Sequence, residues 1–394
     1  MDFTFTEEQQ AAAEAADGVF AGVAPDEVPS PALTRGPVAD TFDRDLWTKL
    51  AEADLLSLLL DEEYGGAGLD PIALCLVLRA SAKVLARVPL LEHSAAAATV
   101  QAHGSAEAKS ALLTRAGRGE LVLTVASQGR TGHDGAELAV TARREGDHWV
   151  LDGMQTAVPW AYDADVIVVP ARTDDRNGPD GSVGTGGGDT GRTVLALVTR
   201  GHEGTVLAEQ VSTTGERLGE LRLESARVPA RDVVEADGAW ERLRLLLATG
   251  TCALALGVGE RVLRMSSEYT GKREQFGYPV ATFQAVAVQA ADRYIDLRAM
   301  EATLWQAAWR IGTGSGTPGA LPAAADVAVA KIWAAEGVRR VVQTAQHLHG
   351  GFGADTDYPL HRYHAWAKHL ELSLGPAAAH EEALGDLLAA HPLG

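Results

Sequence analysis

The chain has 394 residues, of which 46% are hydrophobic, and its 53 acidic and 34 basic residues give a formal net charge of -19. This length suffices for two or three domains with a sizeable core. This excess of acidic residues excludes a broad surface that binds nucleic acid or an anionic membrane. An anionic ligand would therefore need a local basic pocket. The two cysteines, Cys75 and Cys252, stand in apolar runs and support neither a disulfide framework nor a cysteine metal site.

The N-terminal segment 1–8 lacks the basic start and the apolar core of a signal peptide. The sequence also shows no apolar run of the roughly 18 residues that a membrane-spanning helix needs. We therefore expect a cytoplasmic protein that binds neither a membrane nor nucleic acid.

Residues 1–118 predict an N-terminal α-helical domain. Thr6 is a candidate N-cap, and alanine- and leucine-rich segments with helical periodicity follow at 43–60, 71–87 and 92–116. Between two of these segments, three glycines within 61–70 favour a sharp reversal of the chain, with a ligand contact as the alternative interpretation.

Residues 119–228 have the shorter apolar runs, separated by Gly or Asp, that are typical of β-strands. We expect strands at 121–125, 139–142, 148–151, 166–169, 193–198 and 218–223, forming a middle β-barrel or sandwich. The glycine-rich stretch 174–192 lacks the Gly-Lys-Ser/Thr of a phosphate loop and is interpreted as a flexible hairpin insertion.

Residues 229–394 return to long helical periodicity, at 238–271, 281–312, 322–349 and 359–390. These four segments predict a C-terminal four-helix domain, with 312–319 as a linker between two of the helices. The expected fold class is therefore α+β, with an α-helical, a β and a second α-helical domain in chain order.

The stretch 272–284 joins a cation, a tight turn and an aromatic pair between two long helical segments. The guanidinium of Arg273 can direct two donors towards phosphate oxygens, and Gly277 lets the backbone approach a ligand closely. The stretch therefore predicts an anion-binding corner. The alternative interpretation is a surface arginine at a helix C-terminus.

Four further motifs accompany this corner in a fixed order. They are Leu46-Trp47-Thr48-Lys49-Leu50 leading into Tyr64-Gly65-Gly66-Ala67-Gly68, the hairpin 146–153, Val228-Pro229-Ala230, and His349-Gly350-Gly351-Phe352-Gly353. Together with the order of the domains, they make the whole chain resemble the flavin-dependent acyl-CoA dehydrogenase family. The resemblance implies that family's fold, with FAD as the cofactor and an acyl-CoA as the substrate.

The resemblance also implies which residues hold the cofactor. In the family, the arginine and the phenylalanine of the corner contact the FAD pyrophosphate of a neighbouring subunit, and the glycine segment holds the adenine end. The implied FAD contacts are Arg273, Gln275, Phe276, Gln284, His347, Gly350 and Gly351. His347 stands where the family usually has glutamine. No metal site is expected from His347 and His349, because alternate residues of a helix point in different directions.

The family's catalytic base is missing from both of its usual positions. The reaction needs a carboxylate that removes the α-proton of the acyl thioester. By the resemblance, that carboxylate would stand at residue 374 or at residue 247, and both residues are leucines. Glu241 and Glu371 are the alternatives for a relocated base, against the interpretation that both are solvent-facing helix residues.

The segments that would face the flavin ring also depart from the family. Where the family commonly has Thr-Glu-Pro-x-x-Gly-Ser-Asp, this chain has 127–134, with Ser127 at the start and His133 in the place of the serine. Pro159, in a second ring-facing segment, has no backbone N–H to offer flavin. Ser127 and His133 are therefore weak candidates for ring contacts, and His133 with Asp134 could instead form an acid–base pair or a packed turn.

We therefore expect an acyl-CoA dehydrogenase-like subunit that contributes to the FAD site of a complex but lacks the base. This resembles heteromeric family members that act on steroid side-chain CoA thioesters, in which two unlike subunits share a flavin. One alternative is a self-sufficient flavoenzyme, assembled as a homo-oligomer, with a relocated base or a non-CoA substrate. The other is a flavin-free structural or binding protein.

Overall fold

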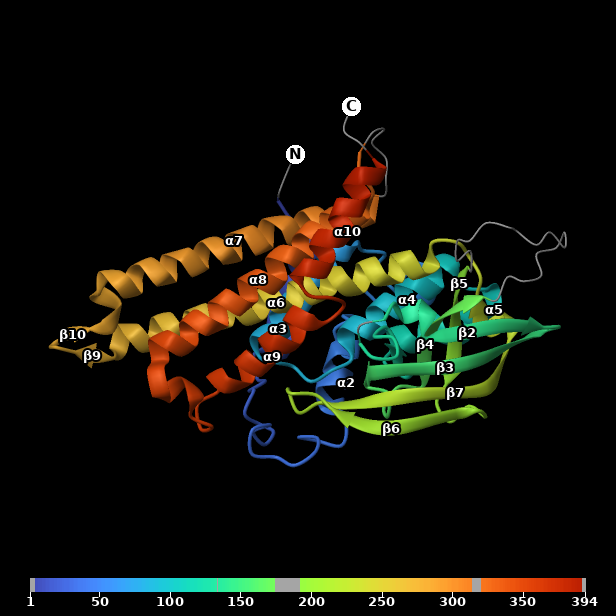
Figure 1. The fold of residues 1–394 in the computed structure, drawn as a ribbon, viewed down its shortest axis with the longest axis horizontal. Helices are drawn as coiled ribbons and strands as arrows, with labels where there is room; N and C mark the ends of the chain where they lie inside the picture. The colour runs from blue at the N-terminus through green and yellow to red at the C-terminus, as the bar shows by residue number, and fades with distance from the viewer. Residues whose placement is uncertain (1–3, 133, 174–191, 314–319, 392–394) are drawn as a thin grey trace.

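The computed structural model describes residues 4–132, 134–173, 192–313 and 320–391. Helices form both ends of the chain, and a sheet built from the middle of the sequence lies on one side of them (Figure 1). The order of helical, sheet and helical parts confirms the predicted fold class. The predicted insertion at 174–192 and the linker at 312–319 fall almost entirely outside the described residues.

The N-terminal part contains short capped helices. Thr6 and Gln9 form a capping box at the first helix, and the side chains of Asp43, Asp70 and Ser105 accept backbone N–H groups at the starts of three others. The helices are α1 (Glu7–Phe20), α2 (Arg44–Glu52), η1 (Glu62–Tyr64), α3 (Pro71–Lys83), α4 (Leu90–His103) and α5 (Ala106–Gly117). The predicted segment 92–116 is thus two helices, because Gly104 and Ser105 separate α4 from α5.

The middle part forms one mixed sheet. All six predicted strand segments lie in strands, whereas β6 and β8 were not predicted. The strands are β1 (Leu123–Val125), β2 (Val140–Glu145), β3 (His148–Pro159), β4 (Val166–Thr173), β5 (Thr193–Thr199), β6 (Thr205–Val211), β7 (Arg217–Pro229) and β8 (Val233–Val234), with 3-10 turns η2 (Ala136–Leu138) and η4 (Ala230–Asp232). They lie in the order β6-β7-β3-β2-β4-β5-β8, and β1 pairs in parallel with β4.

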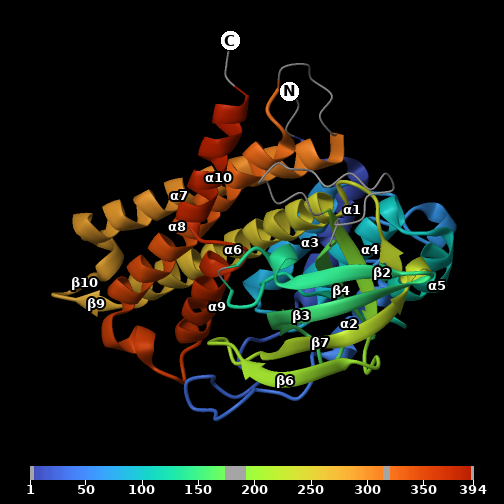
Figure 2. The same cartoon turned by 45° about the vertical axis from the view of Figure 1, so that its right-hand side comes forward.

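The C-terminal part is built around one long buried helix. Its elements are α6 (Ala239–Lys272), β9 (Glu274–Gln275), β10 (Tyr278–Pro279), η5 (Val280–Thr282), α7 (Gln284–Thr313), α8 (Ala323–His349), η6 (Gly350–Ala354), α9 (Leu360–Leu372) and α10 (Ala377–Ala390). Helix α6 packs against α3, α7 and α8 (Figures 1 and 2). It is apolar and long enough to cross a bilayer, which the sequence analysis did not anticipate, but its apolar window is mostly buried inside the fold.

The predicted fourth helix, 359–390, is wrong as a single element. Helix α9 ends at Leu372 and α10 begins at Ala377, and the turn between them has positive φ angles at Leu374 (57°) and Gly375 (101°). Pro376 follows, and proline cannot continue a preceding helix. This turn matters for function because residue 374 is one of the two positions where the family's base is expected.

Candidate functional site

The Arg273 corner is a two-residue hairpin at the end of the helical part (Figure 1). Strands β9 and β10 pair Gln275 with Tyr278, and the two turn residues, Phe276 and Gly277, have φ angles of 54° and 80°. Positive φ at both positions is the signature of a type I′ turn, for which glycine is favoured. The turn places the Phe276 ring outside the protein, with 91% of its surface exposed.

Arg273 presents a guanidinium to the solvent at the base of this hairpin. Its backbone N–H donates to the carbonyl of Tyr269 at 2.8 Å, and its carbonyl accepts from the N–H of Val280 at 2.7 Å, so the backbone on both sides is fixed. No carboxylate among the described residues pairs with its side chain. Because an unpaired guanidinium on a fixed backbone suits a phosphate, the geometry fits the predicted anion-binding corner.

The glycine segment lies next to the corner. The ring of Tyr269, one helical turn before Arg273, stacks on His349 with 4.4 Å between ring centroids and on Phe352 with 5.5 Å. Gly350 has a φ of 61°, and no atom lies within 4 Å of a Cβ built on Gly350 or Gly351. The backbone here is therefore open to a ligand.

The remaining residues implied to contact FAD lie at the same end of the molecule. Gln275 is in β9, Gln284 begins α7, and His347 is exposed in the last turn of α8. His349 is different, because its ring hydrogen-bonds the carbonyl of Ala345 at 2.8 Å and the hydroxyl of Tyr358 at 3.2 Å. The His349 ring is therefore packed inside the glycine segment and does not face a ligand.

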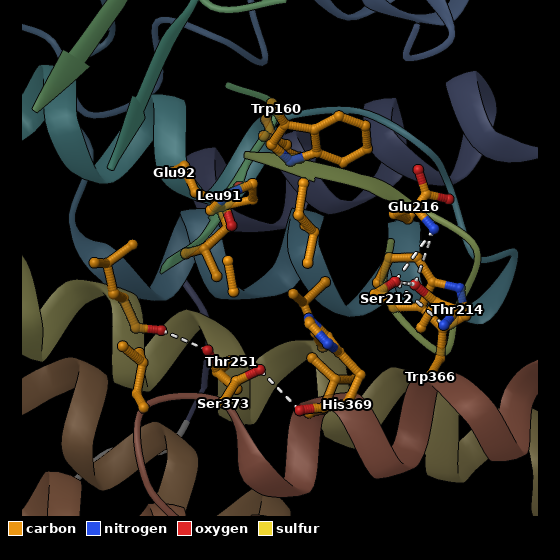
Figure 3. A pocket seen from close by; sticks show the side chains of 18 of the residues that line it. Leu91, Glu92, Trp160, Ser212, Thr214, Glu216, Thr251, Trp366, His369 and Ser373 are labelled. Atoms are coloured by element: carbon orange, nitrogen blue, oxygen red, sulfur yellow. Dashed lines mark hydrogen bonds between the residues drawn. The ribbon is translucent and has the colours of Figure 1, made fainter. Parts of the chain in front are cut away.

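Leu247 and Leu374 line one central pocket. Leu247 is buried on α6, and Leu374 stands in the turn after α9, so the two positions suggested by the resemblance converge in space. The pocket has a volume of about 110 Å³. Figure 3 shows Trp160 and Glu92 on one side of the pocket and His369 and Ser373 on the other. A cavity of this size is small compared with ligand sites, which usually exceed about 300 Å³.

Two titratable side chains of this pocket were missed by the sequence analysis. Burial raises the pKa of Glu92 above its ordinary value and lowers the pKa of His369, so both shifts favour the uncharged form. Glu216 also lines the pocket, but it forms a bidentate pair with Arg87 at 2.7 and 2.9 Å. Glu92 is thus the carboxyl group of the pocket that has no basic partner among the described residues.

Neither proposed relocated base lies in this pocket. Glu241 is half exposed and pairs with Arg244 at 2.9 Å, and Glu371 pairs with Lys368 at 3.0 Å. Glu241 instead lines a neighbouring cleft between the segment 127–137, which connects β1 to β2, and helices α6, α8 and α10. Glu241 and Glu371 therefore each have a basic partner on their own helix, whereas Glu92 has none in the part of the chain that the structure describes.

The segments predicted to face the flavin ring meet at the central pocket, but two of their residues offer it no free backbone N–H. Ser127, Ala157 and Pro159 all line it. The N–H of Ala157, which has a φ of 49°, already donates to the side-chain carbonyl of Gln210 at 2.8 Å. Pro159 has no N–H to give. His133 lies outside the described residues, so its predicted roles stay predictions.

The neighbouring cleft has an acidic lining. It measures about 730 Å³, and among its described residues Arg244 is the only arginine or lysine. His380 adds no positive charge near pH 7, because burial and then Lys331 lower its pKa to about 4. The acidic residues of the cleft are Asp134, Glu137, Glu241 and Asp386. Such a lining repels phosphate groups, so the chain's own cleft does not fit a pyrophosphate.

Family models match both helical ends of the chain. The N-terminal domain of acyl-CoA dehydrogenases matches residues 6–120, and the C-terminal domain matches residues 244–388. Acyl-CoA dehydrogenase FadE27 of Mycobacterium tuberculosis is 36% identical over 395 residues, covering 100% of both chains. The chain belongs to the acyl-CoA dehydrogenase family. It is thereby placed among oxidoreductases that act on CH–CH groups.

Solved structures of acyl-CoA dehydrogenases share this fold over the whole chain. The ChsE4-ChsE5 complex of M. tuberculosis contains a chain with a TM-score of 0.87 and 35% identity, covering 100% of each chain. A variant of the Tcur3481-Tcur3483 steroid acyl-CoA dehydrogenase contains one with a TM-score of 0.85 and 34% identity, covering 98% of each. Both of these family structures are complexes of two differently named proteins.

Proposed function

We propose that this chain is the base-lacking subunit of a heteromeric acyl-CoA dehydrogenase. The observation that carries the proposal is the convergence of Leu247 and Leu374 on one pocket, because leucine cannot accept a proton at either position of the family's base. The Arg273 corner, by contrast, keeps an unpaired guanidinium beside an open glycine segment. The chain would therefore keep the residues that bind the cofactor but lack the carboxylate that removes the proton.

The corner would hold the ADP half of an FAD molecule whose ring lies in a partner subunit. FAD, when bound, accepts the hydride from the β-carbon of the acyl group. In this chain, Arg273 would neutralise the pyrophosphate, Phe276 would cover it, and Gly350 and Gly351 would let the adenine end approach the backbone. The acidic cleft and the occupied N–H of Ala157 disfavour a second flavin placed entirely within this chain.

The partner would be a second acyl-CoA dehydrogenase-like chain. Large apolar side chains are exposed around the corner and along the first half of α7: Phe276, Tyr278, Phe283, Val288 and Ile295. Exposed apolar surface of this extent marks an interaction site. The similar chains of ChsE4-ChsE5 and Tcur3481-Tcur3483 occur in complexes, and the second is named a steroid enzyme, which supports a heteromer and a steroid-type acyl-CoA substrate.

Co-expression tests the proposal. The chain is purified alone and together with an acyl-CoA dehydrogenase-like protein encoded next to it, and the flavin absorbance, the mass of the complex and acyl-CoA oxidation with an artificial acceptor are measured. We expect stoichiometric flavin and turnover in the mixed complex only. If the chain alone carries one FAD per subunit and oxidises acyl-CoA, the proposal is wrong.

A self-sufficient flavoenzyme is the second candidate function, and Glu92 is the observation that favours it. Its carboxyl group lines the central pocket with a raised pKa, as a general base working near neutral pH requires. Glu92→Gln would then abolish turnover of the chain alone while flavin stays bound. A purified chain that shows no flavin absorbance under any condition would instead support a structural or binding protein.

A further inference from the structure

A groove of about 970 Å³ lies away from the central pocket and the acidic cleft. It is formed by α3, α6, α7, the start of α9 and the loop after α1, and its volume is that of a small-molecule site. Its charged residues are five cations (Arg79, Lys83, Arg261, Arg264 and Arg298) and three acids (Asp26, Glu260 and Glu301). In a chain with a net charge of -19, this is a local excess of positive charge.

Two of the three carboxylates of the groove, Glu260 and Glu301, are already in ion pairs. Glu260 pairs with Arg79 and, at 3.4 Å, with Lys83. Glu301 pairs with Arg298 and, at 3.4 Å, with Arg79. These two acids therefore each neutralise part of two cations.

Arg261 and Arg264 are left without an ion pair among the described residues. They lie one helical turn apart on α6, so both guanidinium groups border the same side of the helix. Arg261 contacts the Tyr363 phenol, whose pKa is raised mainly by burial and held back by this arginine. Two neighbouring like charges disfavour each other, and a bound anion would relieve that repulsion.

This pair of arginines is separate from the Arg273 corner. Arg264 precedes Arg273 by two and a half turns of α6, which places the two side chains on opposite sides of the helix, about 13 Å apart along its axis. One ligand phosphate cannot bridge both. The groove is therefore not an extension of the proposed FAD contact.

Apart from Ser267, the rest of the lining is apolar or aromatic. Leu297 and Tyr294 contribute from α7 and Val84 from the end of α3. The hydroxyl of Tyr363 donates to the carbonyl of Lys83 at 2.7 Å and ties α9 to α3, which fixes this wall. The groove thus offers an anion-binding end and a surface on which a flat ring can pack.

We propose that the groove binds an organic phosphate, of the nucleoside diphosphate class, at Arg261 and Arg264. The two guanidinium groups bind the phosphates, and the nucleoside packs against Tyr294 and Leu297. This site is additional to the Arg273 corner and does not depend on the chain sharing a flavin.

Calorimetric titration of the purified full-length chain tests the site, with ADP and inorganic pyrophosphate as the probes. The Arg273→Gln background removes binding at the corner. In that background, we expect ADP to bind, and the added pair Arg261→Gln and Arg264→Gln to weaken binding about tenfold or more. Arg231→Gln, at an exposed arginine outside the groove, is the matched control and leaves the affinity unchanged.

The two probes separate the parts of the site. ADP should bind more tightly than pyrophosphate, because only ADP has a ring to pack, and both affinities should fall as salt rises. The proposal is overturned if Arg273→Gln alone abolishes ADP binding or if the double variant binds ADP as well as its parent does. It is also overturned if the double variant loses a partner protein while ADP binding is unchanged, since the groove would then be a protein interface.

Discussion

Leu247 and Leu374 face the same cavity, although one stands on the buried face of α6 and the other in the turn between α9 and α10. The two positions at which the resemblance predicts a base are thus neighbours in space, and this chain has an aliphatic side chain at both. The absence of a carboxylate at one position is not compensated at the other. This relationship is the structural basis for our proposal that a partner performs the proton-removing step.

Glu241 and Glu371 should be dispensable for catalysis. Each pairs with a cation on its own helix and neither lines the central pocket. In the mixed complex, we expect Glu241→Gln and Glu371→Gln each to leave the turnover of an acyl-CoA substrate within about twofold. A loss of about 10²–10⁴-fold with flavin retained would instead identify a relocated base.

The stability of the protein should depend on Glu92 in a pH-dependent way. Burial raises the pKa of Glu92 above 4.5 in the folded state. As the pH rises above that value, the unfolded carboxyl group ionises first, so the unfolding free energy of the native protein falls until the folded-state pKa is passed. Glu92→Gln cannot ionise.

We therefore expect Glu92→Gln to gain stability relative to the native chain as the pH rises above 4.5. Urea unfolding at four pH values measures this difference, and near-ultraviolet circular dichroism checks that the variant keeps its packing. A difference that does not change with pH would show that the carboxyl group ionises equally in both states.

Lys331 should hold the turn that carries Leu374. The side chain is fully buried, and its ammonium group donates to the carbonyls of Leu370, Glu371 and Gly375 at 3.2, 3.1 and 3.0 Å. Lys331→Met leaves these acceptors without that donor, and we expect it to lower the unfolding free energy by about 1–3 kcal/mol at pH 7. Chemical denaturation measures the loss.

A pH series separates the ammonium group from simple packing. Burial lowers the pKa of Lys331 to about 8. Above pH 8 the folded state loses this proton while the unfolded state keeps it up to about 10.5, so the unfolded state binds more protons and the native chain gains stability as the pH rises over this range. The stability gap between the native chain and Lys331→Met should therefore shift in favour of the native chain between pH 8 and pH 10. A gap that stays constant over this range would contradict the placement of Lys331.

Much of the architecture follows from local sequence signals. Capping residues such as Thr6 and Asp70 mark helix starts, and apolar runs bounded by glycine or aspartate mark six of the strands. Strand β6 was missed because its residues do not alternate cleanly between apolar and polar along the strand. The break at 373–376 was also missed, although Gly375 and Pro376 signal it.

The site was predictable where it rests on backbone motifs and not where it rests on tertiary packing. Gly277 and Gly350 marked the corner and the glycine segment, and both have positive φ angles. Glu92 gave no such signal, because a glutamate in the first turn of a helix ordinarily faces solvent and stabilises the helix N-terminus. Only the packing of Trp160 and the other pocket walls shows that it is half-buried.

The flavin content of the mixed complex with Arg273→Gln in this chain alone tests the central claim most directly. We predict that the complex assembles but that its Kd for FAD rises about tenfold or more, and turnover falls with it, although the partner keeps its own residues. Arg231→Gln, at an exposed arginine in η4 outside both proposed sites, is the control and should leave the flavin unchanged. Unchanged flavin content and turnover in Arg273→Gln would contradict the account.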